Sequence, residues 1–448
     1  MKKSHGSTAR SILAGLFLIA CFSDCAMPQR RSASGSHENA FIVYWPHHRE
    51  QDHRLRLAVK DNIDIKGVVT TAGSEYVAKT SAPATRDAEC LTIALERNVR
   101  IVGKTNLSEF AIAPSGLNEY FGTPGNPFLR QNFIPGGSSS GSAVAVVEGM
   151  ADVAFGTDTA GSVRVPAACV GIVGLKTTFG LVSLKGVLPI DPEHLDTVGP
   201  LAKDVDHAVG GMDLLQKGFA GRYRSAVAAK PLAKNIRIGR LYLNGTDPKI
   251  DKAVDNALAR GHFRVVTLDK AFAAKWNQAK TDGDVVAAAG AWINYKKYVG
   301  KLGVSGQTDA IIAFGEFEYT ANYRSALQRQ VEWQRTLRQV FEKVDFIALP
   351  TLQTLPPTIP LFETMALLEA RMLNLQNTVP VNFAGNPALA IPIPVDERAV
   401  PVTSLQLVGP EFREAELLNA GRLVEASVRG LIDRCLLAKG TRTRQGVD

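Results

Sequence analysis

Cysteine is scarce in this chain, with five residues among 448. No two of them form a C-x-x-C pair, and no histidine or cysteine spacing fits a zinc site. The sequence therefore predicts no metal centre. The cysteines in the body of the chain lie far apart in sequence, so we expect separate buried thiols rather than disulfides at Cys90, Cys169 and Cys435.

Long apolar runs and concentrated positive charge are also missing. After residue 20 no segment approaches eighteen uninterrupted apolar residues, so no later transmembrane helix is predicted. The formal net charge is +8, but short basic clusters occur only near the two ends of the chain. Nucleic-acid-binding domains gather lysine and arginine on one face with aromatic residues between them. We therefore expect no nucleic-acid partner.

The N-terminus has the pattern of a secretory signal. Lys2, Lys3 and Arg10 precede a short apolar stretch over 12–20, which is too short to cross a bilayer. This stretch ends in Leu-Ile-Ala-Cys, which resembles a bacterial lipobox, and the resemblance implies lipidation of Cys21. The sequence thus predicts a periplasmic protein of the cell envelope that meets the membrane only through this anchor. An ordinary signal peptide cut near residue 25, followed by secretion, is the alternative.

Strand and helix patterns alternate along the rest of the chain. Apolar and polar residues alternate over 54–64, a helical pattern covers 87–98, and 100–103 predicts another strand. This alternation favours an α/β fold, expected as a single large domain with a central, mostly parallel or mixed β-sheet flanked by helices. Four segments are expected along the chain: a lipoprotein-type signal at 1–21, a flexible tether at 22–39, a folded domain at 40–438 and a basic tail at 439–448. Within the domain we expect a core at about 55–205 and a peripheral helical insert at about 205–345.

One motif suggests chemistry that its surroundings do not support. Residues 137–141 match G-x-S-x-G, which would make Ser139 the nucleophile of a hydrolase elbow. That elbow must follow a β-strand, and the preceding Asn-Phe-Ile-Pro-Gly is a poor strand. We therefore do not assign Ser139 as the nucleophile.

Three other segments combine a lysine with small-residue loops. Lys60 ends an apolar alternating strand, 135–142 is a Gly/Ser-rich loop, and Ser162 ends a second tight loop at 157–162. A serine hydroxyl is a weak nucleophile that needs a base, and a lysine can be that base only if burial keeps it neutral. The small residues allow close backbone approach and leave N–H groups free to bind an anion.

These segments resemble the amidase signature family. The stretches that carry the resemblance, in the same order as in the family and over nearly all of 40–430, are 57–63, 135–142, 156–167, 171–176, 186–189, 196–202 and 379–388. The bridging serine of the family lies 24 positions before its nucleophile, which selects Ser138 as the bridge to Ser162. The resemblance implies the amidase signature fold and an amidohydrolase that cleaves a carboxamide C–N bond through an acyl-enzyme.

The resemblance also implies a role for each residue. Ser162 attacks the amide carbon, Ser138 relays protons and neutral Lys60 is the final base, without any cofactor. Asp158 and Arg164 are expected to form an ion pair that supports the nucleophile loop. The N–H groups expected in the oxyanion hole are those of Thr159, Ala160, Gly161 and Ser162. The residues expected to bind substrate are Ala113, Pro114, Ser115 and Gly116.

Several alternatives stay open at this point. Ala160 stands where the family often has glycine, which is acceptable if its backbone angle is ordinary. The expected partner is a small-molecule or peptide amide, and a homodimer is an open possibility. A glutamine-dependent amidotransferase subunit is disfavoured by the export signal, because charged tRNA is cytoplasmic. An amide-binding protein without turnover is disfavoured by the complete set of Lys60, Ser138 and Ser162, whereas an esterase would use the same site.

Overall fold

The computed structural model describes residues 39–45, 52–127, 132–359, 365–375, 377–397 and 400–440. The predicted signal peptide, with Cys21, lies outside the described residues, as do nearly all of the tether, residues 441–448 of the tail and the side chain of Cys435. Within the described ranges, no helix combines the length and apolar character needed to span a membrane.

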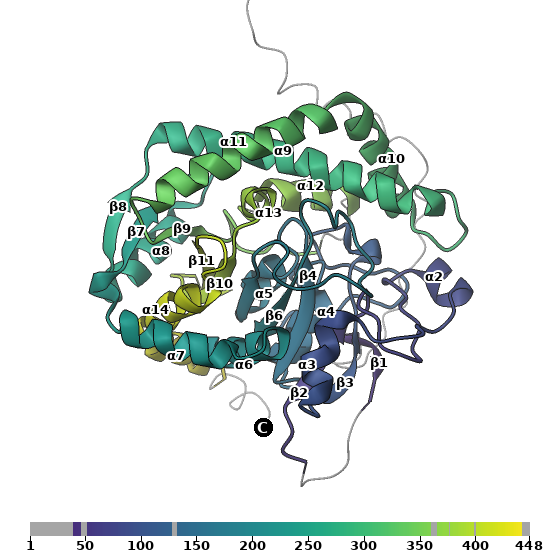
Figure 1. Cartoon of the computed structure of the whole chain (residues 1–448), viewed down its shortest axis with the longest axis horizontal. Coiled ribbons are helices and arrows are strands. Elements are labelled where there is room, and N and C mark those ends of the chain that lie inside the picture. Colours follow the sequence, from purple (N-terminus) through teal and green to yellow (C-terminus); the bar gives the residue numbers. More distant parts are fainter. Residues whose placement is uncertain are drawn as a thin grey trace, which may run out of the picture.

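One mixed β-sheet of eleven strands runs through the centre of the molecule (Figure 1). The strands are β1 Phe41–Tyr44, β2 Arg56–Lys60, β3 Arg100–Thr105, β4 Val153–Asp158, β5 Val173–Lys176, β6 Thr197–Ala202, β7 Arg237–Arg240, β8 Arg264–Thr267, β9 Phe346–Pro350, β10 Ala388–Pro394 and β11 Val402–Val408. Their order is β1-β3-β2-β4-β6-β5-β10-β11-β9-β7-β8. Strand β2 pairs in parallel with β3 and β4, and β7 pairs in parallel with β8 and β9. The predicted α/β fold with one central mixed sheet is confirmed.

Helices cover both faces of this sheet. They are α2 Glu75–Thr80, α3 Thr92–Glu96, α4 Ser140–Val147, α5 Arg164–Val170, α6 Val205–Leu215, α7 Phe219–Ala229, α8 Pro248–Arg260, α9 Lys270–Tyr295, α10 Gly306–Ala321, α11 Tyr323–Phe341, α12 Met365–Leu375, α13 Val379–Ala384 and α14 Glu414–Gly440. Successive strand residues point to opposite faces. Leu57 and Val59 join the core formed with α6, α7 and α14, whereas Ala58 and Ala154 face the core formed with α4 and α5. These alanines allow α4 to approach β2 and β4 closely.

The segment 205–345 differs from the predicted helical insert. It contains the helices α6 to α11, but it also contributes β7 and β8 to one end of the central sheet. Each of these strands has only four residues, too few for a two-residue period to stand out against the long helical patterns around it. In Figure 1, α9 and α11 run side by side along one side of the molecule, and α6, α7 and α14 lie along the opposite side.

Candidate active site

The functional segments predicted from the sequence meet near the ends of two parallel strands. Lys60 is the last residue of β2, and Asp158 is the last residue of β4. Ser138 lies just before α4, and Ser162 lies in the loop between β4 and α5. The carboxyl ends of parallel strands share one edge of a sheet, so the fold brings these segments together.

The Lys60 side chain is fully buried and is held by two hydroxyl groups. Its Nζ donates to Ser138 Oγ at 2.8 Å and to Thr157 Oγ1 at 2.8 Å. Burial lowers the pKa of Lys60 to about 7, although the Asp158 and Asp196 carboxylates act in the opposite direction. A substantial fraction of this lysine is therefore neutral near pH 7 and able to accept a proton.

Two residues that sequence reasoning does not single out fix the position of this lysine. Thr157 Oγ1 accepts a second hydrogen bond from Asn62 Nδ2 at 3.1 Å, and Asn62 Nδ2 also donates to the Leu188 carbonyl at 3.3 Å. Thr157 lies in β4 directly before Asp158, so its place next to a residue that the sequence does single out is the signal that could have found it. Nothing in the sequence pattern marks Asn62 apart from its place two residues after Lys60.

The two serine-bearing loops lie against each other. The Ser139 N–H donates to the Ser162 carbonyl at 3.2 Å, and the peptide bond between Gly137 and Ser138 is cis. Ser139 itself does not have the surroundings of a nucleophile elbow. Its hydroxyl lies 3.4 Å from the Thr157 carbonyl, and no strand precedes it over the described residues 132–138.

A buried ion pair braces the nucleophile loop. Arg164 Nη2 lies 2.9 Å from Asp158 Oδ1, and both side chains are fully buried. The two Asp158 oxygens also accept the N–H groups of Gly161 at 2.8 Å and Val163 at 3.1 Å. Burial alone would raise the pKa of Asp158, but Arg164, Lys176 and the remaining hydrogen-bond donors lower it to about 2. The carboxylate therefore stays ionised and shapes the backbone on both sides of Ser162.

The four backbone N–H groups expected in the oxyanion hole differ in whether they already have a hydrogen-bond acceptor. The Gly161 N–H is already bonded to Asp158, so it is not available to an oxyanion in this conformation. The N–H groups of Thr159, Ala160 and Ser162 find no acceptor among the described residues. Ala160 does not have a positive φ, which satisfies the condition set by its replacement of glycine. Gly161 has φ 137°, and a Cβ there would collide with Thr378 Oγ1.

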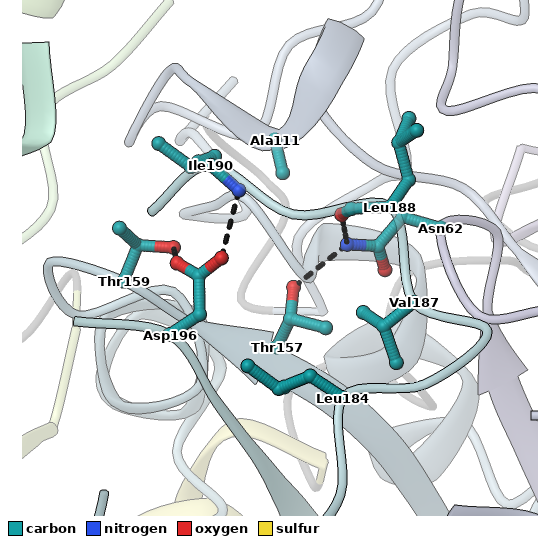
Figure 2. Close-up of a pocket in the computed structure, with 9 residues that line it drawn as sticks. All are labelled: Asn62, Ala111, Thr157, Thr159, Leu184, Val187, Leu188, Ile190 and Asp196. Carbon is teal, nitrogen blue, oxygen red and sulfur yellow. Dashed lines mark hydrogen bonds between the residues drawn. The ribbon is translucent and has the colours of Figure 1, made fainter. Parts of the chain in front are cut away.

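A small pocket lies next to Thr157 and Thr159 (Figure 2). Its lining residues are Asn62, Ala111, Thr157, Thr159, Leu184, Val187, Leu188, Ile190 and Asp196. Its unfilled space of about 210 Å³ includes solvent at its mouth, and no water-sized sphere fits inside it, so the pocket is nearly closed in this conformation. Asp196 accepts the Thr159 hydroxyl at 2.6 Å and the Ile190 N–H at 2.8 Å, and burial raises the pKa of Asp196 to about 6. No lysine or arginine lines the pocket.

The segment expected to bind substrate packs against the Gly/Ser loop. The Pro114 carbonyl accepts the Gly137 N–H at 2.7 Å. The Ser115 N–H donates to Glu369 Oε2 at 3.0 Å, and the Ser115 hydroxyl also bonds to this carboxylate. Ala113, Pro114, Ser115 and Gly116 are buried, and none of them lines the pocket of Figure 2. Their contact with substrate stays a prediction, and the structure gives them a supporting position.

Metal-binding side chains do not gather in the part of the chain that the structure describes. No group of three or more histidine, cysteine, aspartate or glutamate residues is placed there to hold an ion. Cys90 and Cys169 are free and buried.

Known proteins are similar to this chain in both sequence and fold. A family model described as Amidase matches residues 53–418. A glutamyl-tRNA(Gln) amidotransferase subunit of Halobacterium salinarum is 33% identical over 82% of this chain and 94% of the relative. The solved structure of the corresponding protein from Thermotoga maritima has 25% identity and a TM-score of 0.70, with 87% of both chains covered. A crystal structure described as an amidase has 27% identity and a TM-score of 0.67, with 84% of both chains covered. This chain therefore belongs to the amidase family and is an enzyme that acts on carbon–nitrogen bonds.

Proposed function

We propose that this enzyme hydrolyses a carboxamide with Ser162 as nucleophile, Ser138 as proton relay and Lys60 as final base. The observation that carries the proposal is the buried contact of 2.8 Å between Lys60 Nζ and Ser138 Oγ. Burying the amine costs free energy and lowers the pKa of Lys60 to about 7, so the neutral amine is present at neutral pH beside a serine hydroxyl. This amine can accept the proton that a serine nucleophile must lose.

Acylation follows from this arrangement. Lys60 takes the proton of the Ser138 hydroxyl while Ser138 takes that of Ser162, and Ser162 Oγ bonds to the amide carbon. The unpaired N–H groups of Thr159, Ala160 and Ser162 receive the resulting oxyanion, and each such donor contributes about 3–4 kcal/mol to a transition state. The C–N bond then breaks as Ser138 returns a proton to the departing nitrogen, and Lys60 returns its own proton to Ser138.

Deacylation uses the same route with water. A water molecule gives a proton to Ser138, its oxygen attacks the ester carbon, and the bond to Ser162 Oγ breaks as the serine regains its proton. The products are a carboxylic acid and ammonia or an amine. The same steps cleave an ester, so an esterase activity is expected to accompany the amidase activity.

The proposed substrate is a small amide without a negative charge on its acyl part. The pocket beside Thr157 and Thr159 is lined by aliphatic side chains, by the neutral polar Asn62 and the two threonines, and by one buried carboxylate, Asp196, with no lysine or arginine. A free α-carboxylate would be desolvated there without a partner, which is costly.

A second candidate function is supply of ammonia within an amidotransferase complex. It is favoured by the relatives at 30–33% identity, which carry that name. The aliphatic pocket argues against it, because glutamine carries an α-carboxylate. An enzyme that releases ammonia from glutamine far faster than from neutral amides would favour this second function.

The proposed location is the cell envelope, with the chain held by a lipid on Cys21. The support is the basic start, the short apolar stretch and the Leu-Ile-Ala-Cys sequence. The test is fractionation of a bacterial host that expresses the full chain in the presence of a labelled fatty acid. Wild type is expected in the membrane fraction with label and the Cys21→Ser variant without label. An unlabelled wild-type product in the cytosol would refute the proposal.

Reaction with a fluorophosphonate probe tests the nucleophile. Peptide mass spectrometry is expected to find the probe on Ser162, and a panel of amides and matched esters then defines the substrate class. The Ser162→Ala variant is expected to lose labelling and turnover. The matched control is Ser139→Ala, which makes the same exchange at a neighbouring loop serine, and it is expected to keep both. Labelling of Ser139, or full turnover by Ser162→Ala, contradicts the mechanism.

A further inference from the structure

Ala111 forms one wall of the pocket beside Thr157 and Thr159. In Figure 2 its methyl group points into the pocket on the side away from Leu184. Of the nine residues that line the pocket, only Ala111 has no side-chain torsion with which to move aside. Leu184 and Leu188, in contrast, are half-buried and can change rotamer. The position of the Ala111 methyl group therefore depends on its backbone alone.

The backbone at Ala111 has an unusual conformation that hydrogen bonds hold in place. Phe110 has φ 52° and Ala111 has φ 61°, so two consecutive residues lie in the left-handed region that glycine favours. The Phe110 N–H donates to the Ala72 carbonyl at 2.8 Å, and the Ala111 N–H donates to the Ser108 carbonyl at 2.8 Å. These bonds fix the direction in which the Ala111 Cβ points.

Contacts on two sides anchor this turn. The fully buried Phe110 ring lies against Tyr295 and Tyr298, with ring centroids 4.9 Å and 4.8 Å away. The Ser108 N–H donates to the Ser138 carbonyl at 3.3 Å, which joins the turn to the loop of the proposed relay serine. A shift of the turn would disturb both contacts, so this wall of the pocket is rigid.

The lining of the pocket indicates which part of an amide would enter it. The departing nitrogen takes its proton from Ser138 in the proposed reaction, but no residue of the Gly/Ser loop at 135–142 lines the pocket. Thr159, whose N–H is expected to receive the oxyanion, does line it. The pocket therefore begins beside the carbonyl oxygen and away from the departing nitrogen, which leaves it to the acyl group.

We propose that Ala111 is a specificity-determining residue that limits the substrate to amides with the shortest acyl chains, such as acetyl and propionyl groups. The pocket has no room for a water-sized sphere in this conformation, so an acyl group must displace part of the lining. The half-buried leucines can yield, whereas forcing a chain against a fixed methyl group strains the packing. This inference rests on the proposed function, because it concerns the same reaction.

Hydrolysis of acetamide, propionamide, butyramide and valeramide tests the proposal. For wild type we expect kcat/KM to fall with each added methylene. Ala111→Gly removes the methyl group and suits the left-handed backbone, so it should raise the ratio of kcat/KM for butyramide to that for acetamide about tenfold. Ala111→Asn also tolerates this backbone but fills the pocket, and it should lower the ratio for propionamide to acetamide by a similar factor. Unchanged ratios in both variants would overturn the proposal.

Ala72→Gly is the matched control. Ala72 is fully buried, has φ 51° and accepts the hydrogen bond from Phe110, but it does not line the pocket. The same exchange there changes the backbone freedom of the turn without enlarging the pocket, and the ratios are expected to stay those of wild type. A shift as large as that of Ala111→Gly would show that flexibility of the turn, not the methyl group, sets the preference.

A second series, N-methyl, N-ethyl and N-propyl acetamide, varies the departing amine instead of the acyl group. Ala111→Gly is expected to leave the ratios in this series unchanged. A gain here in place of the acyl series would mean that the pocket holds the amine, and the proposal would be wrong.

Fluorophosphonate labelling separates this inference from the function on which it rests. If Ser162 is labelled and amides are hydrolysed while the Ala111 variants keep the wild-type ratios, the role of Ala111 is refuted and the reaction stands. A wild type that is not labelled at Ser162 and hydrolyses none of the amides would refute the proposed function, and the inference with it.

Discussion

Lys60 Nζ lies 2.8 Å from Ser138 Oγ, although 78 positions separate these residues in the chain. Both side chains are fully buried, so bulk water does not compete for this contact. The direction of proton transfer between them depends on whether the lysine is charged. The contact is therefore useful to a hydrolase only above the pKa of Lys60.

The first prediction concerns pH. We expect kcat/KM for a neutral amide to rise with pH through about 7 and then to level off, because the pKa of Lys60 is lowered to about 7 and only the neutral amine is a base. Lys60→Met is expected to reduce turnover by roughly 10³-fold. A pH–rate profile over neutral and mildly acidic buffers is the measurement.

Lys176 provides the control for this profile. Burial and the nearby Arg164 lower its pKa to about 7 as well, but its Nζ donates to the carbonyls of Thr177 and Asn386 and to no serine. Lys176→Met is therefore expected to leave the midpoint of the profile in place. A midpoint that moves in this variant, or that survives in Lys60→Met, would show that another group titrates.

The second prediction concerns Thr157 as a positioning residue. Thr157→Val removes the acceptor of both Lys60 Nζ and Asn62 Nδ2, so we expect kcat to fall about 10- to 100-fold with little change in KM. The midpoint of the pH profile should also move to lower pH, because a hydrogen bond that favours the charged lysine is lost. Thr157→Ser keeps the hydroxyl and is expected to restore both. A fall in kcat with no rescue by serine would point to a packing defect instead.

The third prediction concerns the ion pair of Asp158 and Arg164. Asp158→Asn is expected to lower the free energy of unfolding by about 3–5 kcal/mol, because it leaves the guanidinium buried without its partner. Urea denaturation is the measurement, and the double variant with Arg164→Met is expected to lose less than the sum of the single variants. Additive losses would show that the two residues act separately.

The acid dependence of this pair has a defined sign. Arg164 and other donors lower the pKa of Asp158 to about 2, below its ordinary value of 3.8. Its stabilising contribution is therefore complete above about pH 4 and is lost as the pH falls through 2. No loss attributable to Asp158 is expected between pH 5 and pH 7.

The fourth prediction concerns Glu369, which binds Ser115. Burial raises the pKa of Glu369 to about 7 from 4.5, so the folded protein keeps a proton that the unfolded chain has released. The free energy of unfolding is therefore expected to decrease as the pH rises from about 4.5 to 7. Glu369→Gln cannot ionise and should flatten this decrease in denaturation curves recorded at several pH values.

Asp196 needs a separate control in that experiment. Burial raises its pKa to about 6, so it contributes in the same direction over a lower range of pH. Asp196→Asn is expected to change mainly the part of the decrease below about pH 6, whereas Glu369→Gln is expected to change the part between about pH 6 and 7. If Glu369→Gln leaves that part unchanged, the assignment to Glu369 is wrong.

The strands and loops that carry Lys60, Ser138 and Ser162 could be anticipated from the sequence, because their patterns are local. Apolar alternation predicts β2, and small residues predict the two loops. The contacts of Thr157 with Lys60 and of Ser115 with Glu369 could not be anticipated, since the partners lie 97 and 254 positions apart and meet only through packing. Likewise, the bond from Gly161 N–H to Asp158 depends on a side-chain orientation that no pattern encodes.

Thr157 and Asp158 are consecutive residues of β4, and their side chains serve different partners. The hydroxyl of Thr157 holds Lys60, and the carboxylate of Asp158 holds Arg164 and the backbone around Ser162. Consecutive strand positions alternate between faces, so a slip of one residue exchanges the two. A single-residue insertion or deletion in β4 would therefore turn the carboxylate toward the lysine and the hydroxyl toward the arginine. The length of this strand is constrained for that reason, in addition to the identity of these two side chains.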